Sequence, residues 1–103
     1  MSVYGDWLAA TIAASGTSSA EVNLGASFDL LEIQIPTVTS CTLKVQISET
    51  TGGTFYDLGN VTTDTTTGAY SDVFKLGGYQ FIKIVSSATQ SVERLIRVRG
   101  MRY

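Results

Sequence analysis

The sequence has 103 residues, of which 44% are hydrophobic and 16% charged, and its formal net charge at neutral pH is −2. This length suits one domain with a single apolar core, and the small net charge predicts neither nucleic acid nor an anionic membrane as a partner. With no histidine and one cysteine, the chain cannot build a Ser-His-Asp or Cys-His site or a Cys/His zinc centre, so we expect a non-enzymatic protein without metal or cofactor.

Short segments in which apolar and polar residues alternate recur along the chain. Residues 1–8 are predicted to form an N-terminal arm that carries Tyr4 and Trp7, and residues 9–103 a single domain. Strands are predicted at residues 8–14, 19–24, 31–35, 43–48, 55–58, 70–76, 79–85 and 92–102. The alternation is explicit at residues 19–24, 31–35 and 43–48, whereas residues 8–14 are mostly small and apolar. Turns are expected between them, including one at residues 25–28 and one at Gly77-Gly78, and residues 59–68 are expected to form an exposed loop or an edge hairpin.

Seven or eight short strands with turn signals about every 8–12 residues are typical of an all-β, two-sheet antiparallel β-sandwich of the jelly-roll or Ig-like kind. A small β-barrel is the alternative. A fold built from parallel βαβ units is excluded because the sequence offers no crossover helix.

The last predicted strand carries most of the positive charge. Residues 94–103 contain four arginines and no acid (net +4), whereas residues 1–93 contain nine acids and three lysines (net −6). Arginine and aromatic residues are enriched at the centres of interfaces, so a partner interface is expected at both chain ends. Its candidate residues are Tyr4, Trp7, Arg97, Arg99, Arg102 and Tyr103. The alternative is that the arginines blunt a sheet edge or pair with neighbouring strands.

Other side chains admit more than one interpretation. Cys41 has no partner for a disulfide and is expected to be a small buried apolar residue. Tyr56, Tyr70 and Tyr79 could form a platform on which a sugar stacks, although tyrosines in strands more often pack against neighbours.

The acidic residues and the apolar runs give weaker signals. Asp57, Asp64 and Asp72 lie near strand ends, where carboxylates suit Ca²⁺, but no EF-hand-like spacing is present. No apolar run approaches the roughly 18 residues of a membrane span, and no secretory signal is recognisable.

The order of several motifs resembles that of small β-sandwich virion proteins of tailed bacteriophages. The motifs are residues 15–25 (SGTSSAEVNLG), 31–36 (LEIQIP), 43–48 (LKVQIS) and 52–58 (GGTFYDL). The resemblance covers roughly residues 15–100, and it includes neither the N-terminal arm nor the arginine-rich final strand. It implies a structural role in the particle, as a capsid decoration protein, the base of a head fibre or a tail accessory protein.

Two functions follow from these observations. The first is a capsid decoration or cement protein, a homo-oligomer that binds the major capsid protein or another virion protein at subunit junctions. Such a protein is made in the host cytoplasm and resides on the capsid surface. The second is a carbohydrate-binding or host-surface-binding β-sandwich module, as in a head fibre or tail accessory protein. Neither function uses a catalytic residue.

Overall fold

The computed structural model describes the backbone of residues 3–38, 41–65 and 68–102, and their side chains except those of residues 3, 59–65, 68–70 and 72. Within these residues there is no helix, and all strand pairs are antiparallel, which confirms the predicted all-β antiparallel class. The seven strands are β1 (Val3–Tyr4), β2 (Leu8–Ile12), β3 (Val22–Thr37), β4 (Cys41–Ser48), β5 (Tyr56–Thr65), β6 (Gly68–Ser86) and β7 (Arg94–Arg102).

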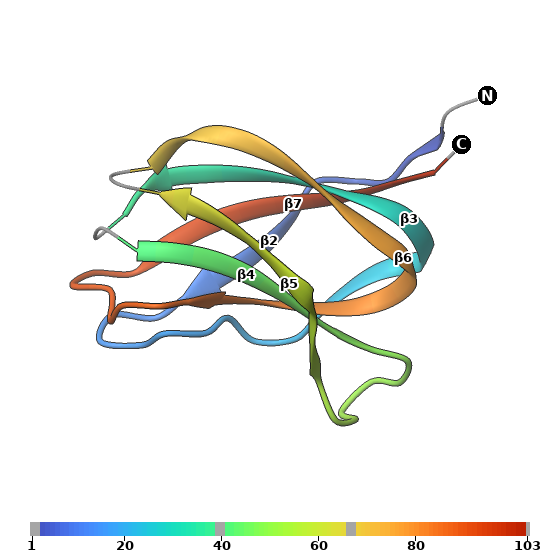
Figure 1. Cartoon of the computed structure of the whole chain (residues 1–103), viewed down its shortest axis with the longest axis horizontal. Coiled ribbons are helices and arrows are strands. Elements are labelled where there is room, and N and C mark those ends of the chain that lie inside the picture. The colour runs from blue at the N-terminus through green and yellow to red at the C-terminus, as the bar shows by residue number, and fades with distance from the viewer. Residues whose placement is uncertain (1–2, 39–40, 66–67, 103) are drawn as a thin grey trace.

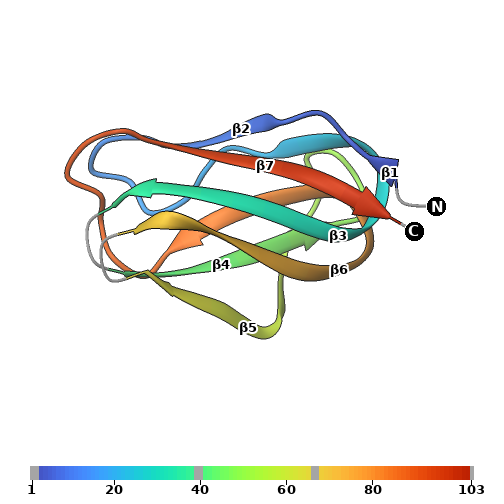
Figure 2. The same ribbon diagram turned by 90° about the horizontal axis from the view of Figure 1, so that it is seen from above.

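The strands form two layers that share two long strands (Figures 1 and 2). Hydrogen bonds join them in the order β1-β7-β3-β6-β4-β5, and β2 also pairs with β7. The first layer contains β1, β2 and β7, together with residues 30–37 of β3 and 68–75 of β6. The second layer contains β4, β5, residues 81–86 of β6 and the start of β3. The sandwich is therefore one continuous sheet folded over on itself.

Glycines let β3 and β6 pass from one layer to the other. Gly25 in β3 and Gly77 and Gly78 in β6 have positive φ angles of 88°, 81° and 92°. Glycine adopts this conformation without steric cost, and the pairing register of the two strands shifts in the same region. The predicted turns at residues 25–28 and at Gly77-Gly78 are therefore wrong, because both are bends inside a continuous strand. Consequently two pairs of predicted strands merge into β3 and β6.

The sandwich is closed on one side and ends in a sheet edge on the other. Isolated bridges from Ile12 to Ser19 and from Ser18 to Val85 join the segment ahead of β3 to both layers. On the opposite side, β5 pairs with β4 alone among the described strands. The prediction of a loop at residues 59–68 is wrong, because the backbone continues as strand to Thr65. The prediction that this segment lies at a sheet edge is confirmed.

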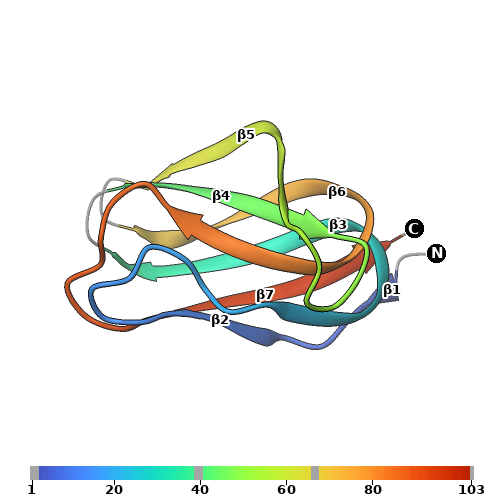
Figure 3. The ribbon, with the colours of Figure 1, turned by 90° about the horizontal axis from the view of Figure 1, so that it is seen from below.

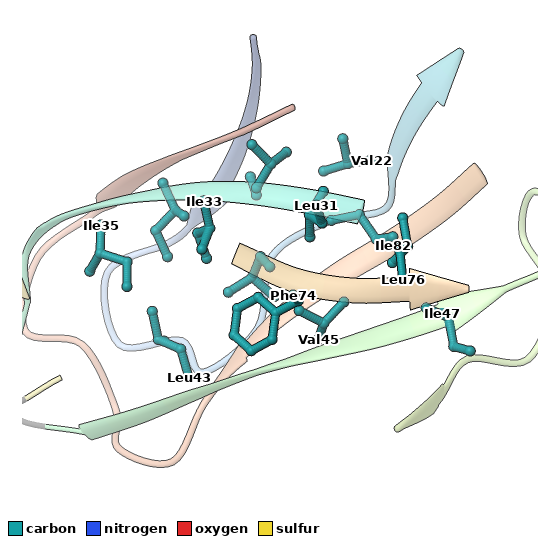
Figure 4. Packing of buried hydrophobic residues seen from close by; sticks show 14 of the residues in the cluster. Val22, Leu31, Ile33, Ile35, Leu43, Val45, Ile47, Phe74, Leu76 and Ile82 are labelled. Carbon is teal, nitrogen blue, oxygen red and sulfur yellow. The ribbon is translucent and has the colours of Figure 1, made fainter. Parts of the chain in front are cut away.

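Within the described side chains, β2, β3, β4, β6 and β7 each place one face in the core, as strand alternation predicts. Figure 4 shows Leu31 and Ile33 of β3 pointing toward Leu43 and Val45 of β4, with Phe74 of β6 between them. Burying each such side chain contributes about 1.5–3 kcal/mol to stability. The buried apolar residues are Ala10, Ile12, Val22, Leu24, Phe28, Leu31, Ile33, Ile35, Val38, Cys41, Leu43, Val45, Ile47, Phe74, Leu76, Ile82, Ile84, Ile96 and Val98. The expected burial of Cys41 is thus confirmed.

One polar side chain fixes the loop between β6 and β7, a segment that the sequence predicts only as a polar turn. Gln90 is fully buried, and its amide donates to Ser86 Oγ at 3.0 Å while its side-chain oxygen accepts from Arg94 Nε at 3.2 Å. Its backbone pairs with the turn after β2, through Ser15 N–H at 2.7 Å and the carbonyl of Gly16 at 3.0 Å. A buried polar group that is fully hydrogen-bonded costs little, so Gln90 anchors this loop to the turn while its neighbours on both sides stay exposed.

Candidate functional site

The two ends of the described chain lie side by side at one end of the molecule (Figures 1 and 3). Val3 pairs with Arg102 and Tyr4 with Met101, and the N–H of Gly5 donates to the carbonyl of Gly100 at 2.8 Å. The residues of the predicted arm thus run antiparallel to the last strand. The division of the chain into an arm and a domain stays a prediction.

Arg99 is held between two aromatic rings and a carboxylate. Its guanidinium carbon lies 4.8 Å from the ring centre of Tyr4 and 4.6 Å from that of Trp7. Its Nε and Nη2 both donate to Oε1 of Glu32 on β3, at 2.9 and 2.6 Å. Arg97 lies 5.2 Å from the Trp7 ring centre. We call these five residues the Arg–aromatic cluster; each such cation–π contact contributes about 0.5–1 kcal/mol at an exposed site.

Strand alternation explains why the cluster lies on the outer face of the first layer. Ile96 and Val98 of β7 are buried, so the residues between and after them, Arg97 and Arg99, point outward. Exposed apolar side chains lie on the same face: Leu95 on β7 is 53% exposed and Val73 on β6 is 50% exposed. We call the cluster together with Leu95 and Val73 the β7 face.

The structure brings four of the six predicted interface residues together. Tyr4, Trp7, Arg97 and Arg99 belong to the cluster, and Arg102 is exposed at the end of β7. Tyr103 lies outside the described residues. The predicted alternative that the arginines pair with a neighbouring strand also holds for Arg99, because it bonds Glu32 of β3.

Glu32 is the cluster residue that the sequence did not reveal. The alternation of residues 31–35 correctly places it on the polar face of its strand. Its place opposite Arg99, which lies 67 residues further along the chain, depends on the register between β3 and β7. No local signal carries that register.

A second candidate region is a groove at the rim where β4 turns toward β5. Its larger part, about 540 Å³, is lined by Ile47, Ser48, Glu49, Thr50, Thr54, Tyr56, Asp57 and Tyr79. An adjoining part of about 310 Å³ is lined by Ser27, Glu49, Gly77, Gly78, Tyr79 and Gln80. Glu49 and Tyr79 line both parts, so we treat them as one rim groove.

The rim groove contains two of the three tyrosines considered as a sugar platform. Tyr56 is 68% exposed and Tyr79 is partly buried. Both line the larger part of the groove. The side chain of Tyr70 lies outside the described side chains, so a platform of all three is neither supported nor excluded.

Carboxylates hold the turn that forms one wall of the groove. Asp57 accepts hydrogen bonds from Gln46 Nε2 at 3.1 Å and Lys44 Nζ at 3.2 Å, and these lower the pKa of its carboxyl. Glu21 accepts from Thr51 Oγ1 at 2.6 Å and from the N–H of Gly52 at 2.7 Å, which lowers its pKa in the same way. The turn between β4 and β5 is thereby tied to the segment ahead of β3.

Among the described side chains, no group of three or more histidine, cysteine or acidic residues could hold a metal ion. Of the three aspartates considered for Ca²⁺, Asp64 and Asp72 lie outside the described side chains. Within the described ranges, no helix is long and apolar enough to cross a membrane.

No protein-family model matches the sequence, and no curated protein matches it either. Solved structures share its fold. The SPBc2 prophage-derived protein YomS is 14% identical with a TM-score of 0.67, and the match covers 98% of this chain and 95% of that one.

Carbohydrate-binding modules are also among the structural neighbours. Chitosan-binding module 1 of a chitosanase/glucanase from Paenibacillus sp. IK-5 is 16% identical with a TM-score of 0.56, over 89% of this chain and 74% of that one. The low-affinity xylan-binding module CBM86 from Roseburia intestinalis is 9% identical with a TM-score of 0.50, over 97% and 94%. At these identities the likeness shows a shared β-sandwich fold, found both in a prophage-derived protein and in sugar-binding modules.

Proposed function

We propose that this protein is a non-enzymatic structural component of a bacteriophage particle, and that it binds the capsid surface through the β7 face as a decoration or cement protein. The observation that carries the proposal is the Arg–aromatic cluster, in which Arg99 is fixed between Tyr4 and Trp7. The likeness in fold to a prophage-derived protein, along nearly the full length of both chains, supports the setting.

The β7 face has the chemistry of a docking surface. Two aromatic rings and an arginine are already ordered by the ion pair with Glu32, so little side-chain entropy is lost when a partner covers them. Beside them lie exposed apolar Leu95 and Val73 and the exposed cation of Arg97. Such a surface complements a partner patch that combines apolar side chains with carboxylates.

Weak binding by each copy suffices for this role. Many identical copies on a shell act together, so each contributes only a few kcal/mol while the assembly as a whole gains avidity. The partner in this proposal is the major capsid protein or another virion protein, and the protein itself is a symmetric homo-oligomer. No bond is made or broken.

Purified particles test the proposal directly. Quantitative mass spectrometry should find this chain in many copies per particle, and its absence from particles would contradict the virion role. Binding of the purified protein to particles that lack it tests the surface: Arg97→Glu should weaken binding by about tenfold or more, because a charge on the β7 face is reversed. Lys83→Glu makes the same change in net charge on the outer face of the second layer and should leave binding unchanged.

Carbohydrate binding is a second function, favoured by one specific observation. The rim groove places exposed Tyr56 and partly buried Tyr79 along one concave surface, as in sites where sugars stack on aromatic rings. The fold it shares with chitosan- and xylan-binding modules is compatible with such a site. A glycan array tests this function; the absence of any bound glycan would contradict it and leave the particle role in place.

A further inference from the structure

We infer that the rim groove binds an extended oligosaccharide that carries amino groups, and therefore positive charge. The inference rests on the second function above, carbohydrate binding, and it names the class of sugar. Three features of the groove lead to it: its length, its tyrosines and the sign of its charge.

The groove suits a chain of sugars rather than a single ring. Its two parts, of about 540 and 310 Å³, meet at Glu49 and Tyr79 and continue across the bend of β6. Volumes of this size are typical of ligand sites. At the bend, Gly77 and Gly78 have open space within 4 Å of the position where a side chain would begin. The floor there is bare backbone, which a ligand can approach closely.

Exposed Tyr56 supplies a stacking surface, and Tyr79, which is partly buried and packs against the core, also lines the groove. Tyr56 lies in the larger part and Tyr79 lies where the parts meet. An aromatic ring offers an apolar face to the C–H groups of a sugar and a negative face to a nearby cation. An amine-bearing sugar can use both properties of the same ring.

The charges lining the groove favour a cation. Among the described side chains, Glu49 and Asp57 line it and no lysine or arginine does. The charge of Asp57 is partly compensated by Lys44 at 3.2 Å. Glu49 is exposed and makes no hydrogen bond or ion pair within the described part of the chain, so its carboxylate is available to an ammonium group. An anionic sugar would be repelled, and a neutral sugar would gain nothing from this charge.

Two oligomers that differ in the charge of their amino groups test the inference. The purified chain is titrated at about pH 5.5, where amines are protonated and carboxylates are ionised, with a glucosamine hexamer and with its fully N-acetylated counterpart, in which a neutral acetamide replaces each ammonium group. We expect the glucosamine hexamer to bind about fivefold more tightly, with an affinity that falls as salt is added. Equal or tighter binding of the acetylated hexamer would overturn the inference while leaving carbohydrate binding intact.

Variants locate the binding. Glu49→Gln should weaken binding of the glucosamine hexamer by about threefold to fivefold and leave the acetylated hexamer unaffected, because it removes one exposed charge. Glu93→Gln removes an exposed carboxylate outside the groove and serves as the matched control. Tyr56→Ala should weaken both hexamers by about tenfold.

Each negative result has a distinct meaning. An unchanged glucosamine affinity in Glu49→Gln would overturn the inference. Failure of every oligomer to bind would remove the second function together with the inference. Chemical-shift mapping on the unmodified chain, which needs no variant, would also contradict the inference if the hexamer shifted signals away from the groove.

Discussion

The β7 face and the rim groove use charge in opposite ways. On the β7 face, a cation is the central group: Arg99 lies between two rings and shares its charge with Glu32, and Arg97 beside it is exposed. In the rim groove the charged lining groups are carboxylates, and Glu49 is the one without a bonded partner in the described residues. A formal net charge of −2 therefore conceals two surfaces of opposite sign, each suited to a different class of partner.

Both surfaces are supported by one hydrophobic core, and a substitution at the centre of this core should destabilise the whole fold. Ile33 on β3 is fully buried and lies opposite Val98 of β7. Ile33→Ala should lower the free energy of unfolding by about 2–5 kcal/mol, because it removes buried methylenes and leaves a cavity. Urea denaturation followed by the fluorescence of Trp7, the single tryptophan, measures the loss. Val92→Ala, at an exposed loop position, should stay within about 0.5 kcal/mol, and a similar loss in both variants would contradict this account.

A glycine under the β7 face offers a more selective change. Gly100 is buried beneath the ring of Phe28, and a Cβ at this position would overlap the ring. Gly100→Ala should cost about 1–3 kcal/mol, because the ring or β7 must shift. It should also weaken binding at the β7 face more than binding in the rim groove.

Gly5, which lies near the same Phe28 ring, provides a comparison for the loss of stability expected in Gly100→Ala. A Cβ at Gly5 would lie 3.1 Å from Cζ of Phe28, so Gly5→Ala should cost less than Gly100→Ala when both are measured by urea denaturation. A larger loss in Gly5→Ala would show that the ring does not pack as described.

The local sequence pattern correctly predicted those strands that need no information about distant parts of the chain. Alternation located β4 and β7 and placed Ile33 and Val45 in the core, and a run of small apolar residues located β2. It could not show that β3 and β6 continue through their glycines. Gly77-Gly78 has the same appearance in a hairpin turn and in a bent strand, and only hydrogen bonds to distant strands on both sides keep the strand going.

Each of the two candidate surfaces likewise contains residues that the sequence predicted and residues that it did not. Composition marked Tyr4, Trp7 and the arginines of β7 as interface residues, and the pairing of β1 with β7 brings them together. The partner Glu32 was missed because its contact depends on tertiary register. The rim groove was only partly foreseen, through Tyr56 and Tyr79, because a groove is formed by segments that meet only in the fold.

The order within the Arg–aromatic cluster can be probed at Arg99. Arg99→Lys keeps the charge but loses the planar group between the rings of Tyr4 and Trp7, so we expect a loss of about 1 kcal/mol and a changed emission of Trp7. Arg97→Lys should have a smaller effect, because Arg97 is exposed and lies 5.2 Å from one ring. Equal effects of the two variants would mean that the rings do not hold Arg99 in particular.

The smallest expected change in stability comes from Glu21 and Asp57, the carboxylates that bond to the turn between β4 and β5 and to the strands beside it. Hydrogen bonds lower the pKa of Glu21 from its ordinary 4.5 and that of Asp57 from its ordinary 3.8. A carboxyl with a lowered pKa in the folded state stabilises the fold above its ordinary pKa, and this stabilisation is lost as the pH falls through the lowered value. We therefore expect the urea midpoint to decline below about pH 4.5, and less steeply in Glu21→Gln and Asp57→Asn.

The same pH series separates the two surfaces. Glu21 is partly exposed and Asp57 is exposed, so the change in midpoint should be small, and it should be accompanied by loosening of residues 49–54 because Glu21 bonds Thr51 and Gly52. Hydrogen exchange of the Gly52 amide at pH 7 and pH 3.5 measures that loosening directly. Glu93→Gln is the control and should follow the unmodified chain. An amide at Gly52 that exchanges equally in the unmodified chain and in Glu21→Gln at pH 7 would show that Glu21 does not hold the turn, and the wall of the rim groove would then need another support.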